Sequence, residues 1–190
     1  MTTTLRVVLD QLVAPTDPDL AMASRELTRA LVAAAPRGCE VSGVVPAAGD
    51  DALAEVRALE GLAGVESSPI PRRELSTALS LGLPSGLGGG MLHSPTLFAP
   101  LVRHDRVHNH EQTVVTIWDL TPWTHPERVS KASVAWHRAM LKRAEKHADA
   151  VIVPLHAMAD ELAERTKLRG RIRVIAGAAP EDFAEPRDAV

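Results

Sequence analysis

Apolar and polar positions form two kinds of pattern along the chain, and each kind predicts a different element. Short, nearly continuous apolar runs rich in β-branched residues are typical of buried strands. They occur at residues 5–10, 40–45, near 65, 90–95, 113–119, 150–154 and 171–177. Longer segments between them repeat their apolar residues every three or four positions, which is the spacing of one helix face. The pattern therefore predicts strands and helices in alternation.

The clearest predicted helix lies between the first two strands. Arg25, Glu26 and Arg29 fall on one side of it. The other side is apolar and is formed by Leu20, Ala23, Leu27, Leu31 and Ala34. We expect this apolar side to cover a sheet. Asp50 or Asp51 is expected to cap the next helix.

Three further helices are expected after residue 69. The two clearer ones lie at about 134–148 and 156–168, where apolar side chains share a face;. Residues 69–90 are less regular, with a short helix around 75–81 followed by GLPSGLGGG. These glycines precede a strand, whereas a phosphate-binding GxGxxG follows a strand and opens a helix. We interpret the segment as a mobile connection.

Alternating helices and near-continuous apolar strands predict an α/β fold. The expected architecture is a Rossmann-like, doubly wound and mostly parallel sheet with helices on both faces. A chain of 190 residues with 45% apolar content can form one domain;. We place that domain at residues 1–180 and a linker or tail at 181–190. Ligands of such sheets bind outside the carboxyl ends of the strands, near the switch in strand order.

Composition narrows the class of protein. The formal charge is −3 and basic residues are scattered, which argues against a nucleic-acid partner;. Cys39 is the only cysteine, so the chain has no internal disulfide and no cysteine cluster for structural zinc;. With no signal sequence or long apolar run, we expect a cytoplasmic protein. Abundant Ala and Arg with few Lys indicate a bacterial source.

Polar and aromatic residues gather at the predicted strand ends. They are Asp10, His93, Ser94, Trp118, Asp119, Trp123 and His125. Any one of them can serve as a helix cap or a loop hydrogen bond, but convergence of several on one rim favours a binding site. An indole face suits either stacking on a sugar ring or packing on a loop, and its N–H can only donate.

Other histidines are weaker candidates. His104, His108 and His110 have a spacing compatible with a metal pair, but a solvated loop with ordinary histidines is favoured;. We expect no metal site. His137 shares the apolar face of its helix and is interpreted as a core histidine.

Four segments carry a resemblance to a known family. They are HSPTLFAPL, TVVTIWDLTPWTHPE, AWHRAMLKRAEKHADAVIVPLHAMADELAE and RIRVIAGA, within residues 93–178. Together they resemble the N-terminal domain of family 4 glycosyltransferases, which is one half of a GT-B fold. The resemblance implies the acceptor-facing half of an enzyme that transfers a sugar, with retention, from a nucleotide-sugar donor. It implies no cofactor, because the nucleotide-sugar is a substrate held mainly by a second, C-terminal domain.

The resemblance also implies partners and a location. The acceptor would be a sugar or a lipid-linked sugar, and the enzyme would be cytoplasmic or peripheral at the inner membrane face. These 190 residues have no room for the acidic pair of the donor domain, so we expect no turnover by this chain alone. Half of such an enzyme exposes the apolar side of its cleft, which a homodimer would cover.

The chain departs from the family at two places. The resemblance implies that Asp119 and Trp118, in the strand-end motif, are the catalytic positions and that the other strand-end residues bind substrate. Trp118, however, stands where the family has a histidine that is expected to meet the donor sugar, and tryptophan cannot accept a proton. The loop after the first strand lacks glycines and carries Asp17 and Asp19, which would repel a diphosphate;. The alternative is a stand-alone Rossmann-like binding or interaction module, a degenerate glycosyltransferase half that acts with a partner.

Overall fold

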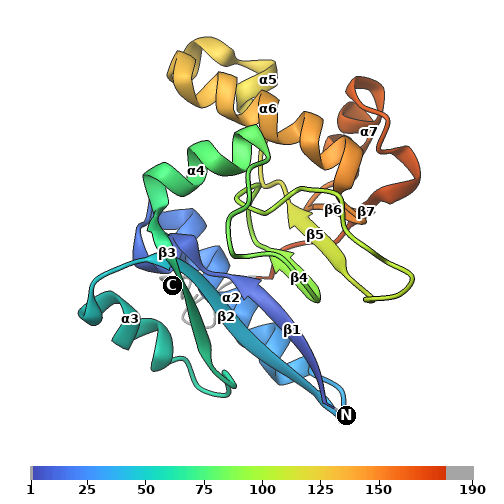
Figure 1. Cartoon of the computed structure of the whole chain (residues 1–190). Coiled ribbons are helices and arrows are strands. Elements are labelled where there is room, and N and C mark those ends of the chain that lie inside the picture. Colours follow the sequence, from blue (N-terminus) through green and yellow to red (C-terminus); the bar gives the residue numbers. More distant parts are fainter. Residues whose placement is uncertain (1, 179–190) are drawn as a thin grey trace, which may run out of the picture.

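A parallel sheet of seven strands runs through the computed structural model, which describes residues 2–178 (Figure 1). The strand order is β3-β2-β1-β4-β5-β6-β7, and every neighbouring pair is parallel. The strands are β1 (Thr3–Val8), β2 (Cys39–Ala47), β3 (Val65–Pro71), β4 (Met91–Ser94), β5 (Gln112–Thr116), β6 (Ala150–Val153) and β7 (Ile172–Val174). The predicted Rossmann-like α/β fold is confirmed. The predicted linker at 181–190 lies outside the described residues.

The middle of the sheet is where the strand order reverses. The chain winds outward from β1 through β2 to β3, then returns to β4 and continues to β7. Leu5 of β1 consequently pairs with Val41 of β2 on one side and with Met91 of β4 on the other. In doubly wound sheets this reversal opens a crevice at the carboxyl ends of the two strands that flank it.

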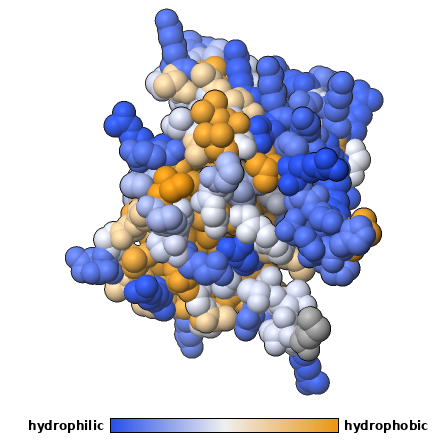
Figure 2. All heavy atoms as spheres, in the orientation of Figure 1, coloured by the Kyte–Doolittle hydropathy of each residue, from blue (hydrophilic) through white to orange (hydrophobic). Residues whose placement is uncertain are grey.

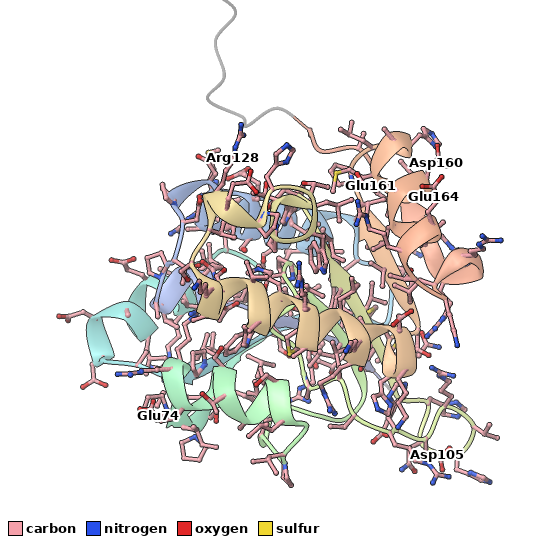
Figure 3. All side chains as sticks on the ribbon, turned by 90° about the horizontal axis from the view of Figure 1, so that it is seen from above. Glu74, Asp105, Arg128, Asp160, Glu161 and Glu164 are labelled. Atoms are coloured by element: carbon pink, nitrogen blue, oxygen red, sulfur yellow. The ribbon has the colours of Figure 1, made fainter. Side chains whose placement is uncertain are left out.

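Helices cover both faces of the sheet, and each face has its own apolar core. On one face, side chains of β1 and β2 meet α2 (Pro18–Ala34) and α3 (Asp50–Arg57). The other face meets α4 (Arg72–Leu81), α6 (Lys131–His147) and α7 (His156–Arg165). Alternation along β1 divides the two cores, because Val7 belongs to the first and Val8 to the second;. Figures 1 and 3 show α4 and α6 side by side.

Short elements complete the described chain. They are α1 (Asp10–Val13), α5 (Thr121–Thr124) and two 3₁₀ helices at Pro126–Arg128 and Arg169–Arg171. Residues 95–111 join β4 to β5 without a helix. Leu97, Phe98, Ala99 and Leu101 of this connection are buried and fill the core beside α4 and α6.

The buried stripe of α2 differs from the predicted one. Its most buried side chains are Ser24 and Thr28, each 1% exposed, whereas Leu20 and Leu27 are only half-buried. The Ser24 hydroxyl donates to the Leu20 carbonyl, and the Thr28 hydroxyl to the Ser24 carbonyl, both at 2.7 Å. Because these hydroxyls are satisfied within the helix, they can be buried without leaving an unpaired polar atom. Gly49, and neither aspartate, is the N-cap of α3.

The segment interpreted as a mobile connection contains regular elements, among them the predicted short helix, and its glycine-rich loop contacts β1. It contains the end of β3, all of α4 and a glycine-rich loop. Arg6 of β1 donates through Nη1 to the carbonyls of Leu87, Gly88 and Gly89 at 3.2, 2.9 and 3.0 Å. Its Nη2 pairs with Glu66 at 2.7 Å. The loop therefore wraps a guanidinium of the central strand.

The surface mixes apolar and polar side chains. Figure 2 shows mostly hydrophilic side chains on the side of α7 and scattered apolar ones toward the middle of the view. Figure 3 places Asp160, Glu161 and Glu164 together on α7, across the molecule from Glu74 on α4. Within residues 2–178, no helix combines the length and the apolar character needed to cross a membrane.

Candidate functional site

A cavity of about 800 Å³ opens at the carboxyl ends of β1, β4 and β5. Its walls come from the residues that follow these three strands and from α4, α5 and α6. Figure 3 shows α6 flanked by α4 and α5. The cavity therefore lies at the reversal of strand order, where a doubly wound sheet is expected to bind its ligand.

All three tryptophans of the chain line this cavity. The Trp118 indole N–H donates to the Pro95 carbonyl at 2.7 Å, and that of Trp136 to the Ser76 carbonyl at 3.1 Å. These bonds tie two of the rings to neighbouring backbone and leave their faces and edges as the apolar wall. A half-buried indole held in this way offers a flat surface for a ligand with an apolar face.

His137 stands between two of the tryptophans. Its ring centroid lies 6.0 Å from that of Trp123 and 4.9 Å from that of Trp136, with both pairs edge to face. Nδ1 lies 2.8 Å from the Ser133 carbonyl oxygen, one turn earlier in α6. The interpretation of His137 as a core histidine was wrong, because its side chain is only half-buried and lines the cavity.

A buried ion pair stands beside the cavity. Asp10 is 1% exposed, and its Oδ2 accepts from Nε and Nη2 of Arg72, both at 2.9 Å, and from the Gln11 amide at 2.8 Å. The Arg72 guanidinium also lies 5.0 Å from the centre of the Phe98 ring. Burial raises the pKa of the Asp10 carboxyl above its ordinary value, and Arg72 opposes that rise;.

His93 and Ser94, both predicted as site residues, are buried and do not line the cavity. Nε2 of His93 lies 3.1 Å from the Thr116 hydroxyl, and burial lowers the pKa of the imidazole to about 4. The Ser94 hydroxyl donates to the Phe98 carbonyl at 3.0 Å and so shapes the turn after β4. Both side chains support the wall behind the cavity.

Three of the predicted residues do reach the cavity. Trp118, Asp119 and Trp123 line it, whereas Asp10 and His125 do not. The Asp119 carboxylate accepts from the Thr121 N–H at 2.7 Å and so holds the turn into α5. His125 is exposed, with Nδ1 3.0 Å from the Thr124 hydroxyl.

Sequence reasoning missed much of the polar lining. The missed residues include Gln11, Arg72, Arg73, Ser133 and Trp136, in addition to the misplaced His137. One available signal was the tryptophan content, since the third indole lies in the same helix as His137. No comparable sequence feature marked Arg72 and Arg73, because the start of α4 lies in the segment where the spacing of apolar residues is least regular.

Two histidines of the histidine-rich loop contact oxygen atoms of the protein. His104 contacts the Val102 carbonyl at 3.0 Å and Asp149 at 2.9 Å, and His108 contacts Asp105 at 3.0 Å. Among residues 2–178, no three side chains of the metal-ligating types come together around one point. These histidines hold the connection to β5.

Comparison with known proteins does not assign this chain to a family. The sequence matches no protein-family model and no curated protein. A proposal of function therefore rests on features of this chain itself.

Proposed function

We propose that this chain is the acceptor-binding half of a glycosyltransferase, and that its tryptophan-lined cavity holds a carbohydrate acceptor. One observation carries the proposal: all three tryptophans of the chain line one cavity at the switch in strand order. Sugar rings have apolar C–H faces that stack on indoles, and hydroxyls that need polar partners. The cavity offers both kinds of surface.

The sugar-transfer part of the proposal is supported by the sequence resemblance. In that scheme a nucleotide-sugar occupies a second Rossmann-like domain, and transfer takes place across the cleft between the two. The enzyme would act in the cytoplasm or peripherally at the inner membrane face. The chain itself would supply acceptor recognition, through Trp118, Trp123 and Asp119 among others.

A specific observation favours a second candidate, a binding module without transfer chemistry. The Trp118 N–H is bonded to the Pro95 carbonyl, so this position offers the donor sugar neither a free donor nor a base;. The Asp17 carboxylate caps α2 by accepting from the Asp19 N–H at 2.8 Å;. The N-terminus of this helix, which could otherwise bind a phosphate, is therefore occupied by a negatively charged side chain. Both features weaken donor binding and leave acceptor binding untouched.

Titration with simple carbohydrates tests the proposal. We expect methyl glycosides of glucose, mannose or galactose, or their disaccharides, to change the tryptophan emission of the chain saturably. Trp123→Leu should weaken that binding about tenfold, because aromatic stacking contributes on the order of 1 kcal/mol. Leu155→Ala, which alters an exposed apolar residue at the start of α7 that does not line the cavity, is the control and should bind like the wild type.

Addition of nucleotide-sugars to the same mixtures separates the two candidates. We expect no transfer by this chain alone, and transfer once a donor domain is supplied in the same reaction. Turnover by the 190-residue chain would contradict its role as half of an enzyme. Absence of a saturable response to every carbohydrate would contradict the proposed function itself.

A further inference from the structure

The hydrogen bonds of His137 determine which of its ring nitrogens carries the proton. Nδ1 lies 2.8 Å from the Ser133 carbonyl oxygen and 3.2 Å from the Ser133 hydroxyl. A carbonyl oxygen can only accept, whereas a hydroxyl can donate or accept, so a hydrogen on Nδ1 satisfies both contacts and a lone pair there would face the carbonyl oxygen. In the neutral imidazole the lone pair is then on Nε2. Nε2 is also the nitrogen farther from the helix backbone, and it has no hydrogen-bond partner within residues 2–178.

The other nitrogens of the cavity wall cannot take this role. Indole, guanidinium and amide nitrogens all carry hydrogens and act as donors. Gln11 is already engaged at both ends, because its oxygen accepts from the Thr16 N–H and hydroxyl, both at 3.0 Å, and its amide donates to Asp10. Among the described side chains that line the cavity, His137 is the one whose neutral form has a nitrogen lone pair;.

The surroundings of His137 hold that lone pair in place. The ring is tied to its own helix through Nδ1 and contacts Trp123 and Trp136 edge to face. An acceptor fixed between two aromatic walls suits a ligand that offers a hydroxyl hydrogen next to an apolar face. A sugar ring has this combination, whereas a carboxylate or a phosphate dianion has no hydrogen to donate.

We infer that Nε2 of His137 accepts a hydrogen bond from one hydroxyl of the bound carbohydrate, and that this bond selects the orientation of the sugar against the tryptophan-lined wall. The inference rests on the proposed function and adds to it a specificity-determining residue. It also requires that the ligand carry a free hydroxyl at the contacted carbon.

The test combines a protein series with a ligand series. The ligands are the best-binding methyl glycoside of glucose, mannose or galactose, and its four monodeoxy analogues. The proteins are the wild type, His137→Phe, which keeps a flat ring but removes both nitrogens, and His125→Phe as the matched control at an exposed histidine outside the cavity. Affinity is read from tryptophan emission and from calorimetry.

We expect one deoxy analogue to bind the wild type about fivefold to tenfold more weakly than its parent, the usual effect of one neutral hydrogen bond. His137→Phe should bind the parent sugar more weakly than the wild type does, by a similar factor. It should bind that analogue with the same affinity as the parent sugar. His125→Phe should behave like the wild type. Wild-type affinity of His137→Phe for the parent sugar would overturn the inference while leaving the proposed function intact.

A second measurement does not depend on affinity. Nitrogen-15 spectra of the free chain at mildly alkaline pH, where histidines are ordinarily neutral, should show His137 protonated at Nδ1. Bound sugar should shift the Nε2 resonance. Protonation at Nε2 in the free chain would overturn the inference, and a wild type that binds no glycoside would overturn the proposed function together with it.

Discussion

Single residues around the cavity divide into those that meet a ligand and those that hold the wall. Asp10 illustrates the second kind. A carboxylate that is 1% exposed needs a counter-charge, and Arg72 supplies one through two bonds to the same oxygen;. The pair ties Arg72, at the start of α4 in the cavity wall, to Asp10, just after β1. The ion pair therefore helps to fix the position of α4 in the cavity wall.

Arg72→Met should lower the free energy of unfolding by about 3 kcal/mol at neutral pH, because it leaves the Asp10 charge buried without a partner. The pKa of Asp10 is already raised by burial, and loss of Arg72 raises it further. A protonated carboxyl needs no counter-charge. The loss of stability in Arg72→Met is therefore complete at pH values above the pKa of Asp10 in that variant, and it becomes smaller as pH falls toward the ordinary carboxyl range. Urea unfolding at neutral and acidic pH measures both effects.

Two variants check that the effect belongs to this ion pair. Arg73→Met removes the neighbouring, exposed arginine and should change stability by no more than about 0.5 kcal/mol;. Asp10→Asn combined with Arg72→Met should recover part of the loss, since no charge stays buried. A double variant less stable than Arg72→Met would show that the pair is not the cause.

His93 gives a pH dependence of the opposite sign. Its pKa falls from the ordinary 6.5 to about 4 in the folded chain. Between these values the unfolded chain binds a proton that the folded chain does not, so the free energy of unfolding decreases as pH falls, by up to about 3 kcal/mol. The free energy of unfolding of His93→Gln should therefore decrease less than that of the wild type over the same pH range.

Denaturation curves at several pH values between 6.5 and 4 measure the His93 contribution. The same substitution at the exposed His156 controls for the loss of a histidine as such. Parallel pH profiles for the wild type and His93→Gln would contradict the assignment.

At the scale of elements, α4 connects the sheet to the cavity. It buries Leu75 and Leu79 in one core and presents Arg72, Arg73 and Ser76 to the cavity. The helix ends at Gly82, whose φ of 73° is the left-handed conformation that glycine adopts most easily;. A Cβ on Gly82 would also stand 2.1 Å from the Arg143 guanidinium of α6.

Gly82→Ala should therefore destabilise the chain by about 1 to 2 kcal/mol, through backbone strain and displacement of Arg143. Gly88→Ala in the following loop is the matched control. It has open space around the new methyl and no positive φ, so its stability should stay close to that of the wild type. Thermal or urea unfolding distinguishes the two, and equal stabilities would refute the role given to the end of α4.

On the scale of the whole molecule, the sequence was sufficient for the class of fold and for part of the site. Buried parallel strands are apolar on both faces, so their runs could be recognised along the chain. Trp118, Asp119 and Trp123 followed from the rule that ligands meet strand ends. The contribution of Arg72 could not be derived, because it depends on the path by which the chain crosses from β3 back to β4.

Two other misses have a local cause. Ser24 and Thr28 count as polar in any periodicity, yet their hydroxyls bond within α2 and let them be buried. His137 shares a helix face with apolar residues, and the pattern does not tell a core from the wall of a cavity. In both cases the deciding fact is a hydrogen bond to a backbone carbonyl one turn earlier.

The central position of β1 has a consequence for synthesis of the chain. β1 emerges from the ribosome before every other described strand, but one of its edges is covered only when Met91 of β4 has been made. At roughly 5–20 residues per second, the wait is roughly 4 to 17 seconds. During that time β1, β2 and β3 can assemble with an open strand edge, which is a template for pairing with another nascent chain. Slow codons between residues 71 and 91 would lengthen this exposure, and a chaperone that recognises open strand edges would act in this interval.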